Sequence, residues 1–333
     1  MKASTTAGRE RLASLRAKRM TLNRAQLASL LRMALPAIAL AALLLAVILR
    51  QPMAASYFGL TLLFNLAVPI ALAAMAQLLV IALGDLDLSI GAFVSLCACI
   101  GAALLPAQPL LAFAALAACI ALYAAVGALI EWRRLPSIVV TLGLSFVWLG
   151  LAVILLPTPG GRAPEWLIDA VKFKTPLAPL AIWAPLAIGL AAHFLVLRSA
   201  WGAVARGAGG NARAVERAGW PLMRIRAGVY ALAGVFGALS GLTLVGLTTS
   251  GDANIASRYT LVSIAAVILG GGQFTGGRVS PTGAVLGAMT LTLAASFLTF
   301  LNIPPDWQIG AQGVILILVL ALRAAIDRLG RGA

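Results

Sequence analysis

Long uninterrupted runs of apolar residues recur along this chain, and they restrict what it can fold into. A helix needs about 20 mostly apolar residues to cross a membrane, and many runs of that kind are present. The mean hydropathy is +1.01, and only 11% of the 333 residues are charged. Unbroken runs favour helices, whereas barrel strands alternate apolar and polar residues. The sequence therefore predicts an all-α polytopic membrane protein.

We expect about ten transmembrane helices, because short polar or glycine-rich stretches separate ten apolar runs. Their approximate bounds are 34–50, 60–83, 88–105, 109–130, 136–156, 178–197, 227–247, 259–271, 281–301 and 308–323. The eighth is short for a full crossing, so either it is a half-helix or the glycines at 270–272 lie inside the membrane. Segments two to five and seven to ten would suit two inverted halves of a transporter, although no convincing residue match connects them.

The net charge of +15 is interpreted as a marker of membrane topology. No base-reading helix or aromatic stacking platform accompanies it, so no nucleic-acid partner is expected. With a cytoplasmic N-terminus, alternate crossings place about four times as many Lys and Arg inside as outside, as cytoplasmic flanks require. We therefore predict both termini in the cytoplasm. The expected parts are a basic tail over 1–33, a membrane domain over 34–323 with a cytoplasmic loop at 198–226, and a C-terminal tail over 324–333.

Two carboxylates interrupt the apolar pattern in Gly84-Asp85-Leu86-Asp87-Leu88-Ser89-Ile90-Gly91. An ionised group at membrane depth costs about 2.5–3.5 kcal/mol on insertion scales, so this break lies at a helix end, in a cavity or against protein. Asp87 precedes a helical run, and we expect its carboxylate to cap the free N–H groups of that helix. The alternative is a polar element that lines or gates a pathway. The same cap does not explain Asp85.

The polar stretch at 207–221 carries a second distinctive pattern. Asn211 is a suitable N-cap, the residues after it favour helix, and Gly219 with Pro221 ends that helix. Two turns are too short to be stable alone, which favours some docking surface. The functional interpretation is docking on a cytoplasmic partner, and the alternatives are a solvated connector or a helix lying on anionic lipid. The residues of this predicted docking helix are Asn211, Ala212, Arg213, Ala214, Val215, Glu216, Arg217 and Ala218.

The sequence predicts no catalytic or metal-binding constellation. The chain has one histidine, and its three cysteines lie inside apolar runs, where thiols act as small apolar residues. The stretch 269–278 imitates a P-loop but lacks its Lys and Ser/Thr, so we expect its glycines to permit tight turns and close helix approach. Polar residues inside the spans, such as Gln77, Thr141 and Ser145, usually hydrogen-bond between helices, and one or two of them would instead face a passage.

Four motifs, in the same order along residues 55–323, resemble those of the membrane permease subunits of ribose-type ABC importers, the family that serves ribose, xylose, arabinose and galactose. Asp-Leu-Ser-Ile-Gly at 87–91 is similar to that family's Gly-Gly-Ile-Asp-Leu-Ser-Val-Gly, and 135–143 is similar to its Pro-Ser-Phe-Ile-Ala-Thr-Leu-Gly. The loop at 202–219 resembles its Gly-Arg-x-x-x-Ala-x-Gly-Gly-Asn motif, and 263–271 resembles its Ile-Ala-Ala-Val-Val-Leu-Gly-Gly.

This resemblance implies a type II ABC importer-like permease, which is a transport subunit and not an enzyme. It implies a second permease subunit in a homodimer or heterodimer, a cytoplasmic ABC ATPase and a periplasmic solute-binding protein, all around a chain embedded in membrane lipid. ATP and Mg²⁺ would bind to the ATPase, so no cofactor is expected in this chain. The helix at 211–218 would be the coupling helix, and the expected location is the bacterial inner membrane.

Some residues depart from the family pattern near the expected pathway. Asp85 stands where the family has glycine, Gln77 stands in place of the Met of a Met-Thr pair, and Thr260 replaces the Glu of Tyr-Glu-Leu. A common pentose is therefore not assured as the cargo. The candidate pathway residues are Gln77, Asp85, Asp87, Thr141 and Ser145.

The expected function is ATP-driven import of a sugar, such as a pentose, hexose or furanose. The same type of permease would also serve a nucleoside, inositol or a signalling sugar, because the binding protein selects the cargo first. A stand-alone secondary transporter is the alternative from another class. It would need an ion-coupling site inside the membrane, for which Asp85 and Asp87 are the candidates.

Overall fold

The computed structural model describes residues 34 and 36–304 together with 307, 310, 313, 314, 317 and 321, and the regular elements in this part are helices. The all-α prediction is therefore confirmed. After a first helix at Pro36–Arg50, the elements are the 3₁₀ turn η1 (Pro52–Ala55), α2 (Tyr57–Leu63), α3 (Ala67–Ala82), α4 (Ile90–Ala103), α5 (Pro109–Arg133), α6 (Ser137–Leu155), α7 (Glu165–Val171), α8 (Leu180–His193), the π-helical turn η2 (Phe194–Arg198), α9 (Ala200–Arg217), α10 (Leu222–Thr248), α11 (Tyr259–Leu269) and α12 (Pro281–Phe300).

Six stretches among the described residues are long and apolar enough to cross a membrane: α2 with α3, α5, α6, α8 with η2, α10 and α12. Three further apolar helices are shorter, namely the first helix, α4 and α11. Each of the first nine predicted segments thus has a helical counterpart. The tenth, 308–323, lies outside the described residues except at single positions.

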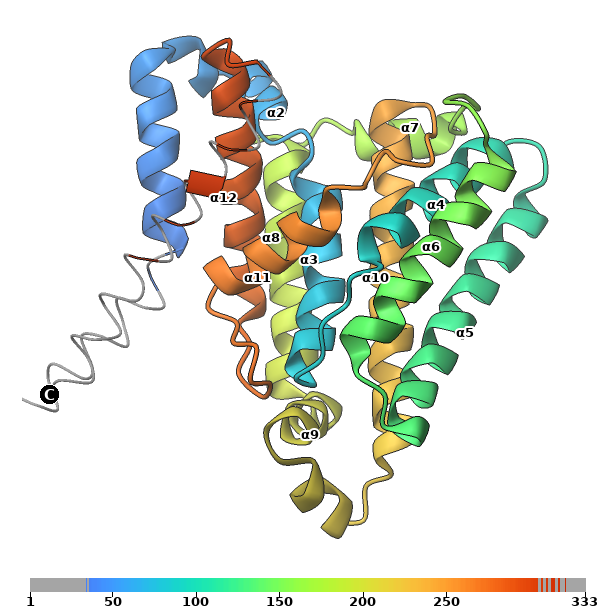
Figure 1. The fold of residues 1–333 in the computed structure, drawn as a ribbon. Coiled ribbons are helices and arrows are strands. Elements are labelled where there is room, and N and C mark those ends of the chain that lie inside the picture. Colours follow the sequence, from blue (N-terminus) through green and yellow to red (C-terminus); the bar gives the residue numbers. More distant parts are fainter. Residues whose placement is uncertain are drawn as a thin grey trace, which may run out of the picture.

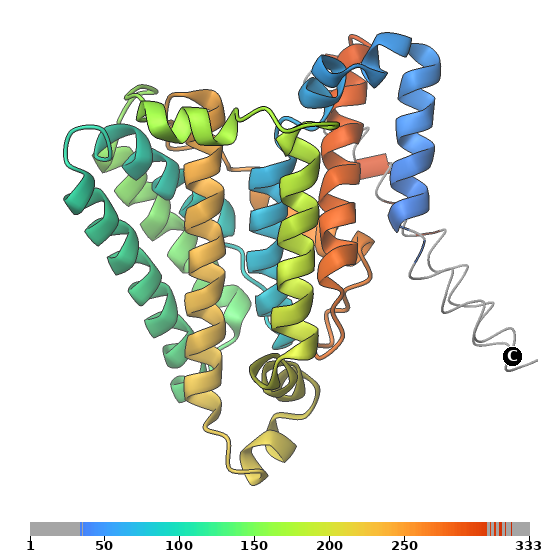
Figure 2. The ribbon, with the colours of Figure 1, turned by 180° about the vertical axis from the view of Figure 1, so that it is seen from behind.

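Two of the short helices start in the middle of the bundle instead of at one of its ends. In Figures 1 and 2, α7 lies at one end of the bundle and α9 at the other, which are called the α7 end and the α9 end below. After α3 reaches the α9 end, an irregular segment leads back to α4, which has 14 residues. After α10 reaches the α7 end, a second irregular segment leads to α11, which has 11 residues.

These two units of helix, break and half-helix are inverted relative to one another, because α3 and α10 run in opposite directions (Figure 1). The arrangement is that of the inverted halves considered from the order of the segments. The eighth predicted segment is the half-helix α11, since its 11 residues are too few for a full crossing. Breaks of this kind are tolerated at membrane depth only where protein or a watery cavity surrounds them.

Helix α10 lies near the centre of the bundle and packs against α3, α4 and α5. Its glycines let α4 approach closely, because a Cβ at Gly237 would come within 2.7 Å of the Phe93 ring and one at Gly241 within 2.6 Å of Cys97. Small residues allow the close van der Waals packing that contributes to helix association in lipid. Cys97 is a buried free thiol at this interface, where it packs as a small apolar residue.

Candidate functional site

The site begins where α3 ends, at Gly84. The backbone of Gly84 has φ +79°, a left-handed conformation that glycine adopts without strain. Its N–H donates to the carbonyl of Ile81 at 2.9 Å, and the N–H of Asp85 donates to the carbonyl of Val80 at 3.2 Å. This pair of bonds is a Schellman motif. It turns the chain away from the helix axis and places Asp85 beside the C-terminal end of α3.

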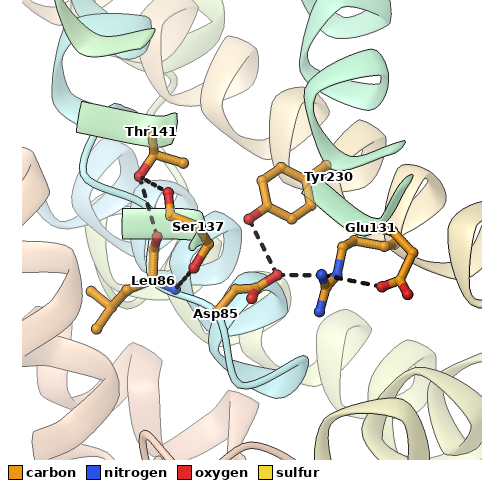
Figure 3. A network of polar contacts seen from close by, with 7 residues as sticks. Asp85, Leu86, Glu131, Ser137, Thr141 and Tyr230 are labelled. Atoms are coloured by element: carbon orange, nitrogen blue, oxygen red, sulfur yellow. Dashed lines mark hydrogen bonds and ion pairs between the residues drawn. The ribbon is translucent and has the colours of Figure 1, made fainter. Parts of the chain in front are cut away.

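Asp85 belongs to a partly buried group of charged and polar side chains (Figure 3). The Nε of Arg226 lies 3.3 Å from Oδ2 of Asp85, and the terminal nitrogen of the same arginine lies 3.1 Å from Oε2 of Glu131. The hydroxyl of Tyr230 donates to Oδ2 of Asp85 at 3.3 Å. Asp85, Glu131, Arg226 and Tyr230 are called the Arg226 cluster below. It joins the segment after α3 to α5 and α10.

Asp87 lies deeper, with an exposed fraction of 1%. Its Oδ1 accepts hydrogen bonds from the N–H and the hydroxyl of Ser89, both at 2.7 Å, and its Oδ2 accepts one from the hydroxyl of Tyr123. The prediction that Asp87 caps the following helix is wrong, because α4 begins at Ile90 with Ser89 as its N-cap residue. The extended backbone continues further than the pattern indicated. The carboxylate therefore reaches the N–H two residues on and forms an Asx turn.

Three side chains hold the backbone of this irregular segment. In the amide orientation that satisfies both partners, Gln77 donates to the carbonyl of Asp87 at 3.0 Å and accepts from its N–H at 3.3 Å. The hydroxyl of Ser137 accepts from the N–H of Leu86 at 3.2 Å (Figure 3). The hydroxyl of Thr141 accepts from the N–H of Leu88 at 3.1 Å. Non-helical backbone inside a bundle needs such partners, because lipid offers none.

The structure thus brings together four of the five candidate pathway residues, namely Gln77, Asp85, Asp87 and Thr141, around one irregular segment. Ser145 is separate, since its hydroxyl donates to the carbonyl of Leu142 in its own helix at 2.6 Å. A cavity of about 370 Å³ lies elsewhere and is lined by Val47, Arg50, Gln51, Phe297, Phe300, Leu301 and Asn302. Contact of the five residues with a solute stays a prediction.

The predicted docking helix is present as the second part of α9. Asn211 has non-helical angles (φ −155°, ψ 85°), and its side-chain oxygen accepts from the N–H of Ala214 at 3.1 Å, so it caps the helix as expected. The helix ends at Arg217, followed by Gly219 with φ +86°. Most of its residues are exposed, whereas Val215 is half-buried. A docking role for this helix stays a prediction.

The first part of α9 was not foreseen as a helix, because its glycines resemble a loop. Ser199 caps it by accepting from the N–H of Gly202 at 2.9 Å, and a serine three residues before that glycine was the available signal. The glycines serve close packing instead. A Cβ at Gly209 would overlap the carbonyl of Ala82, whereas one at Gly210 would meet nothing within 4 Å.

The glycine-rich turn after α11 packs at the same place. The N–H of Gly277 donates to the carbonyl of Ala82 at 2.9 Å, and Gly276 and Gly277 both have positive φ. A Cβ on Gly276 would come within 2.7 Å of the carbonyl oxygen of Gly209. The end of α3, the first part of α9 and this turn therefore meet through backbone contacts. These glycines permit tight turns and close approach, as the sequence indicated.

The family comparison decides which class of protein this chain is. Residues 59–320 match the family model described as the branched-chain amino acid transport system / permease component. The chain belongs to this permease family. It is a multi-pass membrane protein and the permease component of an ABC importer, which makes it a transport subunit and not an enzyme.

Curated relatives agree with this assignment. The Autoinducer 2 import system permease protein LsrC of Yersinia pseudotuberculosis serotype O:3 (strain YPIII) is 31% identical, over 82% of this chain and 81% of the relative. LsrC of Yersinia pestis (strain Pestoides F) is 30% identical over the same shares. No solved structure matches the chain. Among the described residues, no group of three or more His, Cys, Asp and Glu side chains is placed to hold a metal ion.

Proposed function

We propose that this permease carries a sugar-like solute inward across the bacterial inner membrane, and that a cytoplasmic ATPase drives it by docking on residues 211–218. The exposed, capped helix in the second part of α9 is the observation that carries the proposal. It projects beyond the membrane helices at the α9 end (Figure 2). The α9 end is then the cytoplasmic end, and the distribution of Lys and Arg predicts both termini on that side.

The shape of the docking helix suits contact with another protein. Ala212, Arg213, Ala214, Glu216 and Arg217 are exposed, while Val215 turns back toward the bundle, where a Cβ at Gly207 would lie 3.1 Å from its side chain. A short helix of this kind gains stability from the surface on which it docks. It is also continuous with the bundle on both sides, so a push or pull on it reaches the membrane helices.

A signalling sugar is the cargo that the relatives favour, since the matched LsrC proteins belong to autoinducer 2 import systems. At 30–31% identity the cargo need not be the same. A pentose, hexose, nucleoside or inositol remains an alternative. The description of the family model adds branched-chain amino acids to the solutes that deserve a test.

The proposed assembly has a second permease subunit beside this one and a periplasmic binding protein at the α7 end. Helices α5 and α6 turn large apolar side chains outward, among them Leu110, Phe113, Val139, Phe146 and Ile154. Apolar surface of this kind belongs against lipid or against another membrane subunit. ATP and Mg²⁺ would bind to the ATPase.

A stand-alone secondary transporter is the less favoured function. Its coupling ion would need an intramembrane carboxylate that is free to exchange partners. Asp85 is paired with Arg226, and Asp87 is held by Ser89 and Tyr123. Import that continues without any ATPase subunit would revive this alternative.

The docking helix is tested by placing a long charged side chain on its exposed face. Ala214→Arg should abolish co-purification of the ATPase and ATP-driven uptake, because Ala214 is exposed while Val215 packs inward. Ala107→Arg is the matched control for ATPase binding, since Ala107 is exposed in the turn between α4 and α5 at the opposite end, and the ATPase should still co-purify with it. ATPase binding that survives Ala214→Arg would refute the docking assignment.

The cargo is tested separately from the docking helix. Thermal unfolding of the partner binding protein is measured with autoinducer 2, ribose, xylose, galactose, inositol, adenosine and leucine. We expect autoinducer 2 or one of the sugars to raise the unfolding temperature. A shift with leucine alone would replace the sugar assignment with an amino acid.

A further inference from the structure

The carboxylates of the Arg226 cluster lie where they do not stabilise the helices to which they belong. Glu131 lies in the last turn of α5, and Asp85 lies just beyond the C-terminus of α3. Helix C-termini carry partial negative charge and disfavour carboxylates. The positive charge of Arg226 offsets both carboxylates. The side chains of Arg226, Asp85 and Glu131 are only 21%, 10% and 23% exposed. Their arrangement is thus explained by the contact between elements and not by helix stability.

The position of Arg226 in the chain links two parts of the molecule. It lies in the second turn of α10, and only the turn at 218–221 separates α10 from the docking helix. Its guanidinium contacts Asp85, in the irregular segment between α3 and α4. That segment leads to the meeting point of α4 and α11 in the middle of the bundle (Figure 1). Arg226 is therefore a direct contact between the helix next to the docking segment and the break in the membrane helices.

The ion pair between Arg226 and Asp85 joins α10 to a segment of irregular backbone. Asp85 has irregular backbone on its C-terminal side, so its segment is held by side chains more than by a helical ladder. A partly buried ion pair has a definite geometry, and removing one partner leaves the other charge unpaired in poorly hydrated surroundings. Movement of α10 at the α9 end must then either carry Asp85 along or break the pair.

We propose that Arg226 is the positioning residue that transmits movement of the docking helix to the segment at 84–89, through its ion pair with Asp85. This inference rests on the proposed docking of an ATPase at residues 211–218. Glu131 also contacts the guanidinium from the side of α5, and Tyr230 donates to the Asp85 carboxylate, so further partners fix the geometry of the pair.

The test measures whether ATP on the partner ATPase changes the surroundings of the segment. Leu86→Cys, in a background with Cys97, Cys99 and Cys119 replaced by alanine, is labelled with a membrane-impermeant maleimide in the assembled complex. We expect ATP and Mg²⁺ to change the labelling rate by about tenfold, within the range typical of coupled sites. Arg226→Gln should remove this ATP dependence while the ATPase still co-purifies, and Arg226→Lys should restore it.

Two further variants separate transmission from folding. Arg162→Gln removes an exposed ion pair with Glu165 at the α7 end and should leave the ATP dependence unchanged. The triple variant Asp85→Asn, Glu131→Gln and Arg226→Gln leaves no unpaired charge, so it should fold and still lose the response.

An ATP response that persists in Arg226→Gln, or is absent from the parent Leu86→Cys protein, overturns the proposal. Failure of both Arg226→Gln and the triple variant to fold would assign the cluster to stability and also overturn the proposal. Loss of ATPase co-purification from the parent would instead refute the docking assignment and the inference with it.

Discussion

The backbone N–H of Gly91 donates to the hydroxyl of Thr260 over 3.0 Å and so joins the first turns of α4 and α11, although 169 residues separate the two in sequence. The N–H of Ala256 donates to the hydroxyl of Ser95 at 3.0 Å beside it. Both half-helices therefore begin at a common point inside the bundle. Free N–H groups at a helix start need partners when no water is near. Thr260 supplies one for α4, and Ser95 in α4 holds the turn before α11.

Replacing Thr260 by valine should destabilise this junction. The change removes the only side-chain acceptor that the structure shows for the N–H of Gly91 among the described residues. An unsatisfied buried donor costs about 1–3 kcal/mol, so the unfolding temperature in detergent should fall. Thr243→Val is the control, because that hydroxyl bonds only to carbonyls of its own helix, and its effect should stay within about 0.5 kcal/mol. Equal stability of the two variants would contradict the proposed junction.

Gly209→Ala should disturb the contact between α9 and α3, whereas Gly210→Ala should not. A Cβ at position 209 would overlap the carbonyl of Ala82, while one at position 210 meets open space. Overpacking of this kind typically costs about 1–3 kcal/mol. Thermal unfolding of the two purified variants, measured side by side, checks the difference. If the alanine at 209 were tolerated as well as that at 210, the close backbone approach would be refuted.

Asn211→Ala should weaken the docking helix without altering the membrane bundle. The side chain of Asn211 accepts from the N–H of Ala214, and loss of such a cap costs about 1 kcal/mol. The proposed ATPase should therefore bind roughly fivefold more weakly, which a pull-down titration measures. Asn211→Asp keeps an accepting oxygen and should restore binding. No difference between the alanine and aspartate variants would exclude a contribution of the cap to docking.

Gln77→Leu distinguishes a structural role from contact with solute. The structure places the Gln77 amide on the backbone of Asp87, so its loss leaves two buried backbone groups unpaired and should lower stability by about 1–3 kcal/mol. Thermal unfolding is the measurement, and Gln108→Leu, at the exposed start of α5, is the control. A changed KM for uptake with unaltered stability would favour the solute-contact interpretation instead.

The element types followed from the sequence because long apolar runs leave little choice in a membrane. The predicted bounds of the first nine segments agree with the helices to within about three residues, except that α10 begins five residues before the predicted start of the seventh segment. The docking helix was also predictable, since Asn211 and Gly219 with Pro221 mark its ends by local backbone preference. Local rules failed at Asp87 and in the first part of α9. At Asp87, a residue that forms an Asx turn resembles a helix cap in sequence. In the first part of α9, glycines required by close packing resemble a loop.

The sequence by itself determined that the chain is a helical membrane protein, where its apolar helices lie, and that Asp85 departs from the expected family pattern. Only the tertiary structure decided what Asp85 contacts. Its partners, Arg226 and Tyr230, come from α10, and Glu131, which pairs with the same arginine, comes from α5. None of them carries a local signal that links it to the end of α3. The physical reason is that ion pairs and helix contacts depend on distance in space, which packing of α10 against α3 and α5 sets, whereas helix formation depends on neighbours along the chain.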